Sequence, residues 1–228
     1  MRRLFVVLLL ATAISPATAA TIAIIGTGDV AGALGPEFAA QGHRIVYGSR
    51  DPARDSVNAL VERTGHGAAA TTQAEAAKGA DIVVLAVPGM LAPEIVKGLG
   101  ELSGKIIIDP TNPLKRTDHG FELGVDTSNA QIIQAEAPGA YVVKAFNTLN
   151  YRIMIDPQQS GGPVSIPLVG DSADAKATVA KLVEGMGLEP IDLGGVENAH
   201  WVEGMLILWI NNRVGGRQPF DYYLRRTP

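Results

Sequence analysis

The chain has 228 residues, of which 46% are hydrophobic, and this is enough for one large core with a small additional lobe. Its formal net charge of −4 at pH 7 argues against nucleic acid or an anionic membrane surface as a partner. The absence of cysteine excludes disulfides, thiolate metal sites and a cysteine nucleophile. The four histidines are scattered without a ligand spacing, so the sequence predicts no metal site.

The first nineteen residues differ in kind from the rest. Arg2 and Arg3 precede an apolar run, residues 4–10, and Ala17-Thr18-Ala19 provides a small-residue cleavage site. These parts in this order are typical of a secretory signal peptide. We therefore expect residues 1–19 to be removed and the protein to be exported, to the periplasm in a bacterium. If the segment is not a signal, the cytoplasm is the expected compartment. The apolar run is too short for a membrane-spanning helix, and no transmembrane domain is expected.

The next stretch carries the most specific local pattern in the chain. Residues 21–25 form a short apolar run that predicts a buried parallel strand, and a helical pattern occupies residues 30–41. Between them, Gly26, Gly28 and Ala31 fit the dinucleotide fingerprint, in which the glycines allow a tight turn and close approach of a pyrophosphate. A helix N-terminus placed there offers free N–H groups to phosphate. The predicted cofactor-binding residues of this motif are Gly26, Thr27, Gly28, Asp29, Val30 and Ala31.

Strand and helix patterns then alternate to the end of the chain. Strands are predicted at 44–47, 67–70, 81–87, 105–108, 141–145, 165–169 and 189–192. Helices are predicted at 52–63, with Asp51 as its N-cap, and at 72–78, 92–99, 128–137, 173–186 and 197–211, while 150–163 reads as a surface loop. This alternation predicts an α/β fold, a doubly wound parallel Rossmann sheet. We expect a dinucleotide-binding domain at 20–150 and a small C-terminal lobe at 151–228.

The end of the second strand indicates which dinucleotide binds. NAD enzymes usually place an acidic residue there to hold the ribose 2′-hydroxyl, whereas this chain has Ser49 and Arg50. A serine and an arginine can together hold a 2′-phosphate, and Arg54 lies one helical turn further on. The sequence therefore favours NADP(H). Asp51 is an alternative partner for a 2′-hydroxyl, although a helix cap is its simpler role.

The ends of the other strands should line the same crevice, because ligands of doubly wound sheets bind outside the carboxyl ends of the strands. Asn112 and Asn147 could hydrogen-bond the carboxamide, the ribose or a second substrate, or could simply form turns. The further residues expected at the nicotinamide side are Ala86, Val87, Pro88 and Ala145.

Taken together, four segments resemble a known family: residues 24–28, Gly48-Ser49-Arg50, Ala86-Val87-Pro88 and the Lys-Ala-Phe-Asn-Thr block of residues 144–148. They are similar to the NADP oxidoreductases that depend on the deazaflavin coenzyme F-420, and to the soluble reductase domain of the STEAP metalloreductases. The resemblance extends over about residues 21–210. It implies that Ser49, Arg50 and Arg54 hold the NADP phosphate, and that a deazaflavin or flavin is the second substrate, accepting hydride directly.

Hydride transfer between two rings needs positioning more than acid or base chemistry, and we predict no catalytic acid, base or nucleophile. Asp118, His119 and Lys144 are the nearest polar candidates, and Lys144 is equally expected to extend from a strand end towards solvent. The alternative function is a non-catalytic NADP-binding sensor or regulatory subunit.

The closing helix, residues 197–211, is apolar on most faces. A helix that is apolar all round is usually buried, so burial in the core is the first expectation. Half of a homodimer interface and part of the acceptor pocket are the alternatives.

Overall fold

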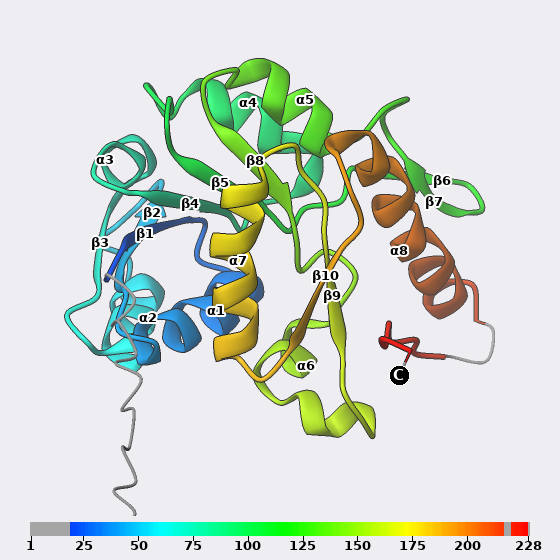
Figure 1. Ribbon diagram of the computed structural model, residues 1–228. Coiled ribbons are helices and arrows are strands. Elements are labelled where there is room, and N and C mark those ends of the chain that lie inside the picture. The colour runs from blue at the N-terminus through cyan, green and yellow to red at the C-terminus, as the bar shows by residue number, and fades with distance from the viewer. Residues whose placement is uncertain (1–18, 217–219, 228) are drawn as a thin grey trace, which may run out of the picture.

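The computed structural model describes residues 19–216 and 220–227. Its centre is a six-stranded parallel sheet in the order β3-β2-β1-β4-β5-β8, seen in Figure 1. The strands are β1 (Thr21–Ile25), β2 (Arg44–Ser49), β3 (Ala69–Thr72), β4 (Ile82–Leu85), β5 (Ile106–Asp109) and β8 (Tyr141–Lys144). The order reverses direction beside β1, so a crevice opens at the carboxyl ends of β1 and β4. The predicted doubly wound Rossmann fold is confirmed.

Helices cover both faces of the sheet, because alternate residues of each strand point to opposite sides. In β1, Ile22 and Ile24 belong to one hydrophobic cluster, and Ala23 and Ile25 to another. The first cluster includes side chains of α1 (Asp29–Ala40), α2 (Asp55–Thr64) and α7 (Ala173–Gly185). The second includes side chains of α3 (Gln73–Lys78), α4 (Ala92–Lys97) and α5 (Asn129–Glu136).

The C-terminal part of the chain adds a parallel pair, β9 (Ser165–Leu168) and β10 (Glu189–Asp192), followed by α8 (Ala199–Val214). An isolated bridge between Lys144 and Val169 links the pair to the edge of the large sheet. Ile166 and Leu182 share the first cluster with β1, so this part and the sheet have a common core. No helix within the described residues is long and apolar enough to cross a membrane.

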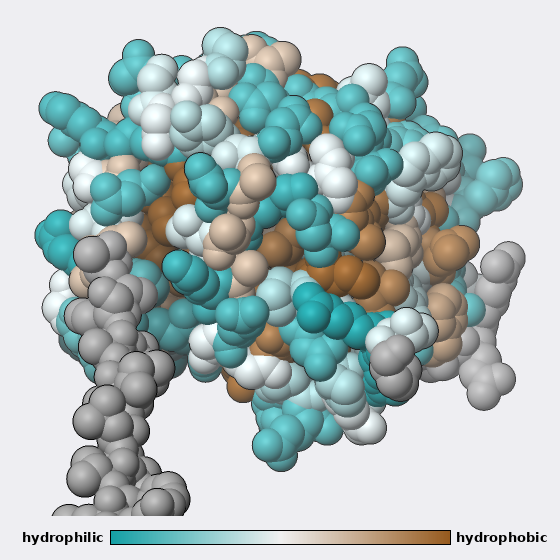
Figure 2. Space-filling view, in the orientation of Figure 1, coloured by the Kyte–Doolittle hydropathy of each residue, from teal (hydrophilic) through white to brown (hydrophobic). Residues whose placement is uncertain are grey.

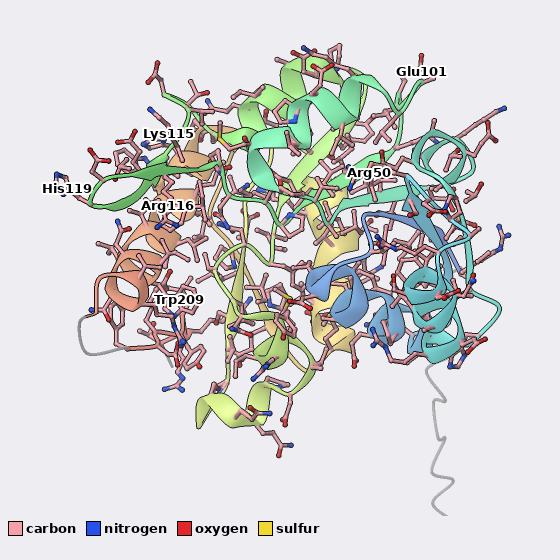
Figure 3. The ribbon with its side chains drawn as sticks, turned by 180° about the vertical axis from the view of Figure 1, so that it is seen from behind. Arg50, Glu101, Lys115, Arg116, His119 and Trp209 are labelled. Carbon is pink, nitrogen blue, oxygen red and sulfur yellow. The ribbon has the colours of Figure 1, made fainter. Side chains whose placement is uncertain are left out.

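Two local predictions are wrong, and one pair of strands is not predicted. Residues 51–54 form a turn in which the N–H of Arg54 donates to the carbonyl of Asp51, so α2 begins at Asp55 and Asp51 is not its cap. The predicted loop at 150–163 contains the short helix α6 (Tyr151–Ile155) and a 3-10 turn, Pro157–Ser160. An unpredicted antiparallel hairpin, β6 (Leu114–Thr117) and β7 (Gly120–Leu123), projects beside α8. Figure 3 shows Lys115, Arg116 and His119 on this hairpin.

Helix α8 is not buried all round, and the expectation of core packing is wrong for one of its faces. Trp201 and Leu208, seven residues apart, have 71% and 70% of their surface exposed. Val202 and Glu203, on the opposite side, are fully or almost fully buried. Apolar surface is visible over α8 at the right of Figure 2.

Candidate active site at the carboxyl ends of the strands

The turn after β1 depends on Gly26. Its φ of +109° is a conformation that other residues rarely adopt, and its N–H donates to the carbonyl of Gly48 at 2.9 Å. A Cβ at this position would lie 2.1 Å from the carbonyl oxygen of Ala86. The turn therefore brings β1, β2 and the chain after β4 into contact at one point, and only glycine fits there.

Gly28 has a different role, because a Cβ built on it would meet nothing within 4 Å. It is the N-cap residue of α1, and no side chain caps the free N–H groups of that helix. Open space in front of an uncapped helix N-terminus is the arrangement that binds a pyrophosphate. The residues present thus fit a dinucleotide, with its phosphates over Gly28.

A cavity of 210 Å³ opens beside this helix end. It brings together six of the predicted cofactor residues, which come from the turn after β1 and the chain after β4. They are Gly28, Asp29, Val30, Ala86, Val87 and Pro88, with Leu85 and Pro110 completing the wall.

A larger cavity of 620 Å³ lies between α1, α2 and α6, and Thr27, Gly28 and Asp29 form part of its wall. Pro36 stands inside α1 and cannot donate to the carbonyl of Gly32. Arg63, from α2, donates to that carbonyl instead, at 3.3 Å. This contact bridges α1 and α2 along one wall of the cavity.

At the end of β2, the predicted phosphate-binding residues lie close to the glycine turn. Arg54 donates from Nη2 to the Thr27 hydroxyl at 3.1 Å. The Ser49 side chain is buried, and its hydroxyl exchanges hydrogen bonds with the backbone of Asp51. Arg50 is exposed at the same strand end (Figure 3). The end of β2 therefore carries two arginines, of which Arg54 contacts the glycine turn, while the Ser49 hydroxyl is bonded to the backbone of Asp51.

Asn112 and Asn147 form a reciprocal pair across the ends of β5 and β8. Asn112 donates to the carbonyl of Asn147, and Asn147 donates to Oδ1 of Asn112, both at 3.0 Å. The preceding residue, Phe146, has a φ of +65°, which is strained for a bulky side chain and typical of functional loops. Oδ1 of Asn147 is buried without a hydrogen-bond partner among the described residues. This atom is enclosed by the protein, and neither asparagine lines the cavity of 210 Å³ or the cavity of 620 Å³.

Two predicted residues lie beneath the cleft surface. Ala31 and Ala145 have no exposed surface and pack in the first hydrophobic cluster. The small side chain of Ala31 allows α1 to pack close to the sheet. The hydrogen bond from the Ala145 N–H to the carbonyl of Asp109, at 3.2 Å, joins the ends of β8 and β5.

Lys144 does not extend to solvent, so that expectation is wrong. Its side chain is completely buried between two carboxylates, 2.8 Å from Asp109 and 2.6 Å from Glu203. Burial raises the pKa of Glu203 above its ordinary value, while Lys144 acts in the opposite direction. Asp118 and His119, the other polar candidates, are exposed at the tip of the β6–β7 hairpin.

Sequence reasoning missed Asp109 and Glu203. A signal existed for Asp109, because it follows three isoleucines at a strand end, and the structure pairs it in register with Lys144. Glu203 is the single acidic residue of α8 and lies in its apolar part, residues 201–210, which is a weaker signal.

A further cavity, of 70 Å³, lies between the chain after β8 and α8. Thr148 and Asn150 form one side, and Leu206 and Trp209 the other. The chain near the C-terminus closes it with Tyr222, whose hydroxyl is buried without a partner among the described residues. Burial raises the pKa of Tyr222 to about 12, so its phenol remains a hydrogen-bond donor at neutral pH.

The sheet order, the glycine turn and the uncapped helix end define a Rossmann protein of the dinucleotide-binding class. A family model described as "NADP oxidoreductase coenzyme F420-dependent" matches residues 21–113. The F420-dependent NADP reductase of Methanothermobacter marburgensis is 30% identical over 212 residues, which cover 86% of this chain and 93% of that protein. The chain belongs to this family and is an NADP oxidoreductase.

Two further comparisons agree. A solved structure of a candidate F420-dependent NADP reductase from Arthrobacter sp. FB24 has a TM-score of 0.81 and 34% identity, covering 91% of this chain and 100% of that one. Metalloreductase STEAP3 of Rattus norvegicus is 30% identical over 191 residues, or 83% of this chain. The matched region spans only 37% of that longer relative.

Proposed function

We propose that the protein transfers hydride between NADP(H) and a deazaflavin or flavin-like acceptor. The observation that carries this proposal is the contact between Arg54 and Thr27, which places a guanidinium beside the glycine turn where no acidic residue follows β2 directly. A guanidinium at this place can bind a 2′-phosphate, whereas NAD enzymes usually place an acidic residue there to accept from the ribose 2′-hydroxyl. Membership of the NADP oxidoreductase family supports the same cofactor.

In this proposal the chain contributes binding and orientation. The N–H groups at the start of α1 hold the pyrophosphate, and Val87 and Pro88 pack against the nicotinamide half. Asn112, the partly exposed member of the asparagine pair, hydrogen-bonds the carboxamide. Bound NADPH supplies the hydride. The cavity between Thr148 and Trp209 would receive a polar edge of the acceptor, with the Tyr222 phenol as donor.

The test is turnover by purified protein. With NADPH and a panel of deazaflavin, flavin and quinone acceptors, the absorbance of the reduced nicotinamide should fall with at least one deazaflavin or flavin. Turnover only with quinones would contradict the proposed acceptor class. Tight NADPH binding without turnover on any acceptor would favour the non-catalytic alternative, which family membership does not favour.

Replacing Arg50 tests the cofactor assignment. Arg50→Ala should weaken NADPH binding roughly 10–100-fold and leave NADH binding almost unchanged, because only the 2′-phosphate loses a charge-assisted hydrogen bond, worth about 1.5–3 kcal/mol. Fluorescence titration with both nucleotides measures the two affinities. Arg44→Ala is the control, since Arg44 is exposed at the opposite end of β2. Equal losses of affinity for NADPH and NADH would contradict the assignment of Arg50 to the 2′-phosphate.

We also propose that residues 1–19 are a cleaved secretory signal and that the mature protein is exported. In support, Ala19 is exposed, and cleavage after it would retain Ala20, whose N–H donates to His43 at 3.2 Å and whose carbonyl accepts from Arg44 at 3.0 Å. The hydrogen bond from the N–H of Thr21, the first residue of β1, to Asp81 would be retained as well. N-terminal sequencing of the natively expressed protein tests this, and an intact Met1 on the folded protein would contradict it.

We propose in addition that two copies associate through the exposed face of α8. Trp201 and Leu208 lie on one side of this helix, and both are mostly exposed. Large apolar side chains gathered on one exposed face are typical of interfaces.

A further inference from the structure

Asp109, Lys144 and Glu203 form a cluster of three ionisable side chains, each with no exposed surface. Nζ of Lys144 lies 2.8 Å from Oδ2 of Asp109 and 2.6 Å from Oε1 of Glu203. Its third hydrogen bond goes to the carbonyl of Thr111, at 2.6 Å. The ammonium therefore uses all three of its donors, on partners from β5, the following loop and α8.

The two carboxylates are also bonded on their other sides. Oδ1 of Asp109 accepts from the N–H of Thr111 at 2.8 Å. Glu203 accepts from the N–H of Asn129, the first residue of α5, at 2.9 and 3.1 Å. A carboxylate at a helix N-terminus is well placed electrostatically, so the cluster joins α8 to α5 as well as to the sheet.

The cluster holds both members of the Asn112–Asn147 pair through adjacent residues. Lys144 and Asp109 both bond the backbone of Thr111, which directly precedes Asn112. Asn147 donates to the carbonyl of Val202, the residue before Glu203, at 3.0 Å. Movement at Glu203 or Lys144 would therefore displace the asparagine pair and the chain before it, where Pro110 lines the cavity of 210 Å³.

Fold stability alone gives little reason to bury three charges at this point. Well-packed apolar side chains of similar size are often as stabilising as a buried ion pair, because desolvation offsets most of the attraction. Directional bonds to the backbone of Thr111 and Asn129, in contrast, fix the positions of the loops that carry them.

We propose that the Asp109–Lys144–Glu203 cluster positions Asn112 and Asn147, and through them the nicotinamide relative to the hydride acceptor. Asp109, Lys144 and Glu203 are then positioning residues, not catalytic ones. This inference rests on the proposed hydride transfer and extends it to residues outside the cofactor cleft.

Glu203→Gln is the main test, because it keeps the size of the side chain and removes one charge. We expect single-turnover hydride transfer from NADPH to the best acceptor to fall roughly 10–100-fold, as small misplacements of reacting groups do. NADPH affinity should change less than about threefold, because the phosphate contacts at the start of α1 and at Arg54 remain. Glu197→Gln is the matched control, an exposed glutamate just before α8.

A double-mutant cycle with Asn112→Ala separates positioning from general structural damage. If Glu203 acts through the asparagine pair, its substitution should have much less effect when Asn112 is already absent. Additive losses would overturn the proposal. So would a Glu203→Gln protein that transfers hydride like the wild type and the Glu197→Gln control, even if its melting temperature falls.

Failure of the proposed hydride transfer and failure of the positioning role give different results. If the wild type transfers hydride to no acceptor, the hydride-transfer function itself is wrong. The fluorescence lifetime of bound NADPH then reports how firmly the cluster fixes the nicotinamide. We expect a shorter lifetime with Glu203→Gln and no change with Glu197→Gln, and an unchanged lifetime in both would overturn the positioning role as well.

Discussion

At the scale of single residues, Gly26 and Gly28 stand two positions apart in one motif and meet different constraints. A side chain at Gly26 would collide with the carbonyl of Ala86, whereas a side chain at Gly28 would project into open space. The first glycine is needed by the fold, and the second by the ligand.

This contrast gives a paired prediction. Gly26→Ala should lower the free energy of unfolding by about 2 kcal/mol or more, because it combines a positive φ with a backbone collision. Gly28→Ala should unfold like the wild type but bind NADPH at least roughly tenfold more weakly, because its methyl group occupies the pyrophosphate position. Urea unfolding and nucleotide titration measure both effects. A destabilised Gly28→Ala protein with normal affinity would contradict this division of roles.

At the scale of elements, α8 links the buried cluster of Asp109, Lys144 and Glu203 to the β6–β7 hairpin. Its first half carries Glu203 into the buried cluster, and its second half holds the β6–β7 hairpin. Asn211 accepts from the N–H of Phe121 at 2.6 Å and donates to the carbonyl of the same residue at 2.8 Å. The Asn211 side chain thus bonds the two backbone groups of Phe121 that a neighbouring strand would otherwise bond.

Removing that side chain should loosen the hairpin and leave the sheet intact. Asn211→Ala leaves two partly buried backbone groups without partners, a cost of about 1–3 kcal/mol. Hydrogen exchange at Phe121 should become roughly tenfold faster or more, with exchange in β1 unchanged. Asn212→Ala is the control from the next position. Equal exchange at Phe121 in both variants would show that Asn211 does not hold the hairpin.

At the scale of the whole molecule, the exposed face of α8 and the oligomeric state are linked. If two copies associate there, Leu208→Glu should weaken the dimer by about 2 kcal/mol, because it places a charge at an apolar contact. Analytical ultracentrifugation over a range of concentrations measures this. Tyr141→Glu is the control, since Tyr141 is similarly apolar and 47% exposed but lies at the amino end of β8. A wild-type protein that remains monomeric at all concentrations would contradict the proposed dimer.

Much of the sheet and half of the cleft could be predicted from sequence. β1 and β10 are predicted with their observed bounds, and most other strands and helices within a few residues, because apolar runs and helical periodicity are local properties. Val87, Pro88 and the glycine turn were placed together because parallel strands end at one edge. The β6–β7 hairpin was missed because its short, mostly exposed strands lack an apolar run, and it is held by Asn211 from ninety residues away.

By itself the sequence determined the strand–turn–helix unit around Gly26 and Gly28 and, from it, a dinucleotide-binding Rossmann protein, and Ser49 and Arg50 added the preference for NADP. That unit depends on backbone geometry within about ten residues, which residue type and spacing specify directly. The tertiary structure alone decided that Lys144 is buried between Asp109 and Glu203, and that α8 is half exposed. Both depend on which segments that are distant in sequence come into contact in the fold. The sequence around a charged residue or an apolar helix face does not identify the segment that packs against it.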